Sequence, residues 1–140
     1  FRFEPENGSL ELLQRISSAP SQASGMYDQF SYGYLGLALD EQSQVLYYLC
    51  GGPIAGEKHE GAALAKGGAR GPENLHLVTY SLLQHTYRDH GPLFYGNGER
   101  PTYVNSIALG KDGYIYSLAR LERGGSTITD LIRIPAPTHY

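Results

Sequence analysis

The sequence of 140 residues contains no tryptophan, one methionine and one cysteine, Cys50. A single cysteine cannot form an intramolecular disulfide, so no disulfide framework organises the chain. Cys50 lies in the apolar run VLYYLC. A small buried residue is a more common role there than a nucleophile, and the sequence shows no histidine paired with it.

Long apolar runs and clusters of basic residues are missing as well. No run approaches the roughly 18 apolar residues of a membrane-spanning helix, so we expect no membrane association. The eleven Lys and Arg residues are scattered and the net charge is −3. This argues against nucleic acid, because phosphate neutralisation requires clustered positive charge. The patterns H-E-x-x-H, C-x-x-C and G-x-x-x-x-G-K-[ST] are absent, so we expect no metal site and no cofactor.

Tyrosine, glycine and proline are abundant, at 12, 18 and 8 residues. This composition favours strands and tight turns over helices. The length corresponds to about one domain, and 41% hydrophobic residues are enough for an ordinary core.

A hairpin pattern occurs twice. Residues 102–121, TYVNSIALGKDGYIYSLARL, combine two apolar runs with a Lys-Asp-Gly turn. Residues 34–49 align without a gap to residues 104–119, with Leu39 on Leu109 and Val45 on Ile115. A weaker match pairs residues 1–16 with residues 75–90, and a further copy of its first half is DLIRIP. Such internal similarity indicates a repeated unit.

The repeated unit consists of up to four short strands, which we label a to d from the inner strand outward. The pattern predicts these strands in the order c-d, a-b-c-d, a-b-c, at residues 1–4, 10–16, 33–39, 45–50, 74–80, 85–89, 103–109, 114–121 and 129–134. Four short antiparallel strands per repeat resemble the blades of the β-propeller superfamily. The resemblance implies an all-β fold with about two blades in one partial propeller covering residues 1–140. The blade pieces are residues 1–16, 33–95 and 103–134.

Two alternatives stay open at this point. An antiparallel sandwich or barrel with two similar hairpins has the same short-strand periodicity. If the propeller interpretation holds, two blades are too few, because propellers typically need four to eight. We therefore expect further blades as partners, either from a larger propeller or from copies of the chain in an oligomer.

The longer connections are expected on one face. Strands within a blade alternate in direction, so the d-to-a and b-to-c connections emerge together, and the short a-to-b and c-to-d turns emerge on the other side. Long loops on a rigid scaffold usually carry binding and catalysis. The expected functional face comprises residues 17–32, 51–73, 90–102 and 122–128.

Candidate site residues lie in these loops and at the leading ends of the inner strands. Tyrosine offers an apolar ring with a hydroxyl, and asparagine and histidine give directed hydrogen bonds, which suits a carbohydrate or a protein. The candidate binding residues are Tyr32, Tyr34, His59 and Asn105. The candidate catalytic residues are His90, or alternatively His59, for proton transfer, Tyr103 as acid or base, and Arg100 to neutralise a carboxylate.

These residues support a leading function and two others. The leading hypothesis is a binding scaffold that recognises a carbohydrate-like or protein partner, and it predicts an open, aromatic-lined concavity. The second is part of a propeller enzyme, a lyase or hydrolase acting on a sugar or acidic polysaccharide, which requires His90, Arg100 and Tyr103 to converge. The third is a structural piece whose partner chain holds the active residues. The sequence does not indicate a compartment.

Overall fold

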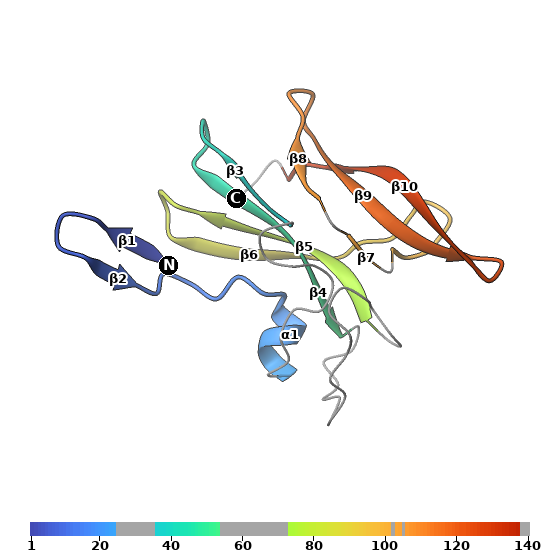
Figure 1. The fold of residues 1–140 in the computed structure, drawn as a ribbon, viewed down its shortest axis with the longest axis horizontal. Helices are drawn as coiled ribbons and strands as arrows, with labels where there is room; N and C mark the ends of the chain where they lie inside the picture. The colour runs from blue at the N-terminus through green and yellow to red at the C-terminus, as the bar shows by residue number, and fades with distance from the viewer. Residues whose placement is uncertain (25–35, 54–72, 102, 105, 138–140) are drawn as a thin grey trace.

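The computed structural model describes residues 1–24, 36–53, 73–101, 103–104 and 106–137, which fold mainly into antiparallel β-strands (Figure 1). The all-β prediction is confirmed. The one described helix, α1 (Ala19–Ser24), has six residues. The strands are β1 (Arg2–Glu4), β2 (Ser9–Glu11), β3 (Leu37–Asp40), β4 (Val45–Pro53), β5 (Glu73–Ser81), β6 (Thr86–Pro92), β7 (Tyr103–Val104), β8 (Ala108–Leu109), β9 (Tyr114–Arg123) and β10 (Ser126–Pro135).

The described strands form three sheets. Strands β3, β4, β5 and β6 pair in chain order and form the expected four-stranded antiparallel sheet. In the second sheet β9 pairs with β10 on one side and with β7 and β8 on the other. Strands β1 and β2 form a separate two-stranded hairpin.

The core lies between the two larger sheets. Val45, Tyr47 and Leu49 alternate along β4, and Leu75 and Leu77 alternate along β5, so these side chains share one face. They pack on apolar residues of the second sheet, and burial of apolar area is the main favourable contribution to folding. These partners are Val104, Ile115, Ala119 and Ile134.

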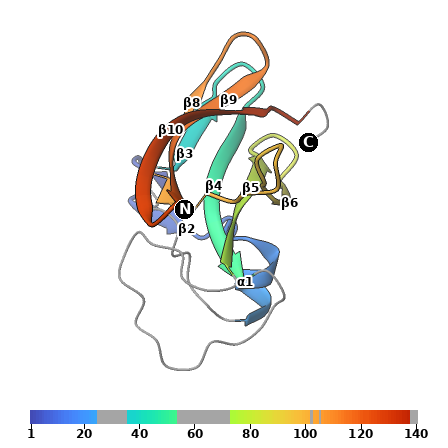
Figure 2. The same cartoon turned by 90° about the vertical axis from the view of Figure 1, so that its right-hand side faces the viewer.

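The segment that contains α1 packs on the opposite face of the four-stranded sheet, and α1 itself lies beside the end of β4 (Figure 2). Tyr48, Cys50 and Val78 form a smaller buried cluster there, with Ile16 packed against it. The hydroxyls of Ser18 and Ser21 both donate to the carbonyl oxygen of Gly51, at 3.1 and 3.0 Å. These bonds attach α1 to β4 near the end of the strand.

Four connections share one turn geometry. Each of the β1–β2, β3–β4, β5–β6 and β8–β9 connections has four residues, and the fourth residue has a positive φ. These residues are Gly8 at 68°, Gln44 at 55°, His85 at 54° and Gly113 at 81°. Glycine adopts this conformation without steric penalty, whereas other residues are strained there. All four belong to the short-turn side predicted from the sequence.

We predict opposite effects on stability at two of these turns. Gly113→Ala should lower the free energy of unfolding by about 1 kcal/mol, and His85→Gly should raise it by up to about 1 kcal/mol. Urea unfolding followed by circular dichroism measures both. If both substitutions changed the free energy of unfolding in the same direction, the two turns would not share this backbone geometry.

Two predicted strands differ from the structure. The strand expected over residues 10–16 ends at Glu11. The strand expected over residues 103–109 is divided into β7 and β8, because side-chain hydrogen bonds replace regular backbone pairing at Ser106. The amide of Leu118 donates to Ser106 Oγ at 2.9 Å, and Ser117 Oγ donates to the carbonyl oxygen of Ser106 at 2.6 Å. Side chains that bond the backbone in this way compete with regular strand pairing.

Candidate functional site

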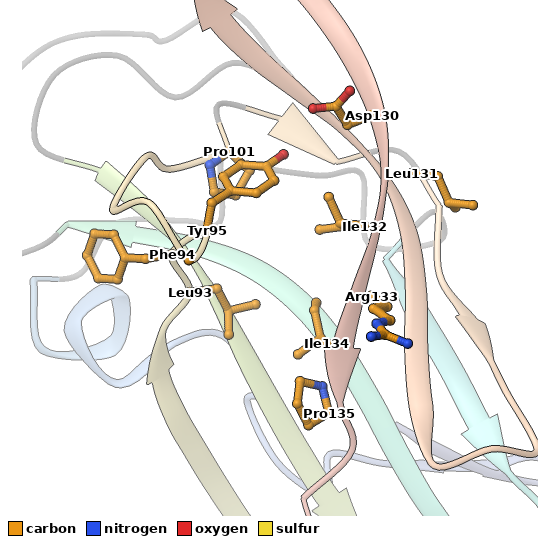
Figure 3. A pocket seen from close by; sticks show the side chains of 11 residues that line it. Leu93, Phe94, Tyr95, Pro101, Asp130, Leu131, Ile132, Arg133, Ile134 and Pro135 are labelled. Carbon is orange, nitrogen blue, oxygen red and sulfur yellow. The ribbon is translucent and has the colours of Figure 1, made fainter.

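A pocket of about 410 Å³ lies between β10 and the connection from β6 to β7 (Figure 3). One wall is residues 93–96 with Pro101, and the other is the continuous stretch 130–135 of β10. The pocket combines apolar and aromatic side chains with a few polar groups, which is the usual composition of a binding site. The apolar lining comprises Leu93, Phe94, Pro101, Leu131, Ile132 and Ile134, and the polar lining comprises Tyr95, Asp130 and Arg133.

The β6–β7 connection is held by its own hydrogen bonds. The amide of Leu93 donates to the carbonyl oxygen of Leu75 at 2.7 Å, which anchors the connection to β5. The amide of Tyr95 donates to the carbonyl oxygen of Glu99 at 2.8 Å and closes the loop. Glu99 then forms an ion pair with Arg123 of β9, at 2.6 Å. The ion pair therefore links the connection to β9, the strand that pairs with β10.

Electrostatics at this end favour a fixed ion pair and a neutral tyrosine. The hydrogen bonds from Arg123 and then Asn97 hold the pKa of Glu99 below its usual value. Burial raises the pKa of Tyr95, and the negative charges of Asp130 and Glu99 raise it further. The Tyr95 hydroxyl therefore keeps its proton, and among the described residues it has no hydrogen-bond partner. This hydroxyl is itself buried and points toward the side of Asp130 (Figure 3).

Strand β10 has a free edge along the pocket. Within the described part of the chain it pairs only with β9. The amide of Ala136 donates to the carbonyl oxygen of Gly113, so even-numbered residues direct their backbone groups toward β9. Odd-numbered residues, among them Leu131 and Arg133, direct theirs to the free edge.

The side chains at this edge are accessible. Leu131 is 71% exposed and Phe94, on the facing wall, is 55% exposed. The guanidinium of Arg133 lies 4.7 Å from the centre of the Tyr114 ring, a cation–π contact that holds the charge at the pocket margin. The pocket thus offers apolar surface, one carboxylate and a row of β10 backbone groups that have no strand partner among the described residues, while the Arg133 guanidinium lies on the outer face of the strand (Figure 3).

The predicted site residues are only partly described. His90 lies on β6, where its Nε2 is 2.8 Å from Thr79 Oγ1. Arg100 directly precedes Pro101 of the pocket and is half-buried. Tyr103 begins β7, but its side chain lies outside the described structure, so the convergence of these three stays a prediction. Tyr32, Tyr34, His59 and Asn105 also lie outside the described residues.

His90 should make stability depend on pH near neutrality. Burial, and then the nearby charge of Arg88, lower the pKa of His90 below its usual value. Folding therefore favours the neutral ring, and this contribution is complete above about pH 6.5 and is lost as the pH falls through the folded-state pKa. Urea unfolding at about pH 7.5 and pH 5.5 should show a lower stability for the wild type at the acidic value.

Two substitutions test the assignment. His90→Asn should reduce this pH dependence, whereas His85→Asn, in an exposed turn, should keep it. If the difference in stability between about pH 7.5 and about pH 5.5 is unchanged in His90→Asn, a group other than His90 causes the pH dependence.

Sequence reasoning missed a buried histidine–aspartate pair on the other face of the four-stranded sheet. His76 Nδ1 of β5 lies 3.0 Å from both carboxylate oxygens of Asp89 of β6, and the side chains are 4% and 8% exposed. Asp89 also accepts from the amides of Ala19 and Gly91, at 2.7 and 2.8 Å. A register shift between β5 and β6 places the carboxylate beneath His76. The aspartate connects β5, β6 and the start of α1.

Hydrogen bonds keep this carboxylate charged. Burial by itself would raise the pKa of Asp89, but the bonds from His76, Ala19 and Gly91 outweigh it and lower the pKa. Burial and the charge of Asp89 raise the pKa of Tyr87, whose hydroxyl donates to the carbonyl oxygen of Ser17 at 2.8 Å. The arrangement attaches residues 17–19 to the sheet.

Cys50 lies on the same face. It is the cross-strand partner of His76 and is fully buried, as expected for a structural cysteine. His76 Nε2 has no hydrogen-bond partner among the described residues. Alternation along β4 and β5 could have placed Cys50 and His76 on the same face of the sheet. Placing them opposite each other also requires the register between the two strands, which the sequence does not contain.

The described residues contain no group of three or more His, Cys, Asp or Glu arranged to hold a metal ion. None of the described helices has the length and apolarity required to span a membrane. Comparisons with family models, with curated proteins and with solved structures found no match for this chain.

Proposed function

We propose that the chain is a binding scaffold of the β-propeller type that recognises an extended segment of a protein partner in the pocket beside β10. The observation that carries the proposal is the pocket itself, which combines apolar side chains with the Tyr95 ring and is formed by a hydrogen-bonded connection and a strand edge. The connection from β6 to β7 belongs to the loop face expected to be functional. The scaffold hypothesis predicted a concavity of this kind.

The fold supports the propeller part of the proposal. One four-stranded sheet packs through its face on a second sheet, as successive blades do. The shared geometry of the four short turns is what a repeated hairpin unit would produce. The second sheet contains counterparts of the first three strands, and β10 has no described neighbour at the position that β6 occupies beside β5.

A protein ligand fits the pocket better than a carbohydrate. Six consecutive residues of β10 line it, and their outward backbone groups repeat at the spacing of a paired strand. An extended polypeptide satisfies such a row of donors and acceptors, whereas a sugar has no matching repeat. Alternate side chains of the added strand would meet Leu93, Tyr95 and Ile132, which is the mode of recognition known as strand addition.

The test uses the full chain with two sets of probes. One is an array of immobilised decapeptides in which apolar and polar residues alternate, and the other is an array of oligosaccharides. We expect binding to a subset of the peptides. Tyr95→Ala should weaken that binding by at least about tenfold, because the Tyr95 ring lies between the connection and β10 (Figure 3) and aromatic residues in a pocket often dominate affinity.

The control is Leu83→Ala, since Leu83 is 71% exposed in the β5–β6 turn and does not line the pocket. It should bind the peptides as the wild type does. Binding to oligosaccharides alone, or equal loss in both variants, would contradict the proposal.

A further inference from the structure

We infer that the extended segment in the pocket is β2 of a second copy of this chain, which adds to the free edge of β10 and places its apolar face in the pocket. This inference rests on the proposed function, because it names the partner of the same pocket. It starts from two surfaces that have no cover among the described residues, the edge of β10 and one face of the β1–β2 hairpin.

The hairpin exposes an apolar face that a solitary two-stranded unit cannot bury. Phe3 and Leu10 are directly paired and therefore share a face, and Phe1 and Leu12 continue it by alternation. The four side chains are 60–81% exposed. A lone hairpin is marginally stable in water, and a patch of this kind usually marks an interaction site.

The pocket offers the matching surface. The inner face of β10 carries Ile132 and Ile134, and Leu93 lies on the facing wall. An added strand beside β10 continues the alternation of the sheet, so Leu10 and Leu12 would lie on this inner face. Ser9 and Glu11 would then lie on the outer face, near Arg133, which brings opposite charges together.

The same chain contains an example of this pairing. Strand β6 pairs antiparallel with the edge of β5 that does not face β4, and it follows a four-residue turn whose last residue has a positive φ. Strand β2 follows a turn of the same geometry and is the second strand of its hairpin, as β6 is. Adding β2 of another copy to β10 would complete the second sheet in the way that β6 completes the first.

The contact would be head-to-tail, because the hairpin and the β10 edge are different surfaces. Such contacts form closed rings or open chains, and each copy uses both surfaces. This property allows a test in which two inactive variants restore each other. Leu10→Glu disables the hairpin, and Leu131→Pro removes a free-edge amide without affecting a bond to β9.

The experiment is sedimentation velocity on the full chain over a range of concentrations. The wild type should associate, and each variant alone should weaken association by at least about tenfold. An equimolar mixture should form heterodimers that grow no further, because it contains one intact hairpin and one intact edge. Leu131→Ala is the control, since it loses the exposed side chain but keeps the amide, and it should associate more strongly than Leu131→Pro. Circular dichroism confirms that each variant is folded.

Three outcomes would overturn the inference. A wild type that stays monomeric at every concentration excludes self-association, while peptide binding that is lost in Tyr95→Ala would still support the proposed function. Loss of association in Leu131→Pro but not in Leu10→Glu would show that β10 pairs with a different segment. Two folded variants that fail to combine would exclude a head-to-tail contact.

Discussion

Asp89→Ala is expected to lower the free energy of unfolding by about 3 to 5 kcal/mol, because it leaves several buried hydrogen-bond donors without their acceptor, and each such group costs about 1 to 3 kcal/mol. The substitution deprives His76 Nδ1 and the amides of Ala19 and Gly91 of their acceptor. Buried donors without partners retain the full cost of leaving water. Urea unfolding followed by circular dichroism measures the loss, and proteolysis near residues 17–24 should accelerate.

The matched variants separate the causes. Asp89→Asn keeps the shape and one acceptor oxygen, so it should be less destabilising than Asp89→Ala. Glu11→Ala breaks an exposed ion pair with Arg2 and should change stability by less than about 1 kcal/mol. The contribution of Asp89 to the free energy of unfolding should also be lost as the pH falls below about 4. A carboxyl group whose pKa is lowered by folding stabilises the fold only while it is ionised, and it becomes protonated as the pH falls through that pKa. Equal small effects of all three variants would show that the pair is not a structural connection.

Leu49→Ala is expected to destabilise the chain by about 2 to 5 kcal/mol, the range for truncating a buried leucine. Leu49 is fully buried in the core between the two larger sheets. Leu37→Ala, at a 40% exposed position on β3, should cost much less. Because the sheets share one core, Leu49→Ala should preserve a single unfolding transition. Two separate transitions, or equal losses in both variants, would contradict a common core.

The strands could be predicted from local patterns. The alternation in β4 and β9 and the turns that precede them are properties of neighbouring residues, so their positions followed from the sequence. The division between β7 and β8 could not be predicted in this way, because it depends on hydrogen bonds that Ser106 accepts from Ser117 and Leu118 of β9. The end of β2 at Glu11 could not be predicted either, because the apolar residues that follow it continue the strand pattern in the sequence but do not pair with β1 in the structure.

The sites were harder to predict because they join distant segments. The sequence directed attention to the loop face and to Arg100, and the pocket does include the neighbouring Pro101. Its other wall, residues 130–135, could be found only once the sheets were packed. The pairing of His76 with Asp89 required the register and its irregularity between β5 and β6. Short-range patterns contain neither.

Hydrogen exchange at single amides of β10 tests the central claim, that the free edge of this strand is the binding surface. The measurement compares the full chain when dilute and when assembled or bound to a peptide from the array. In the dilute chain, Leu131 and Arg133 should exchange rapidly while Ile132 and Ile134 are protected by β9. In the bound state, Leu131 and Arg133 should become protected. Exchange at these two amides that is equal in both states would contradict the account.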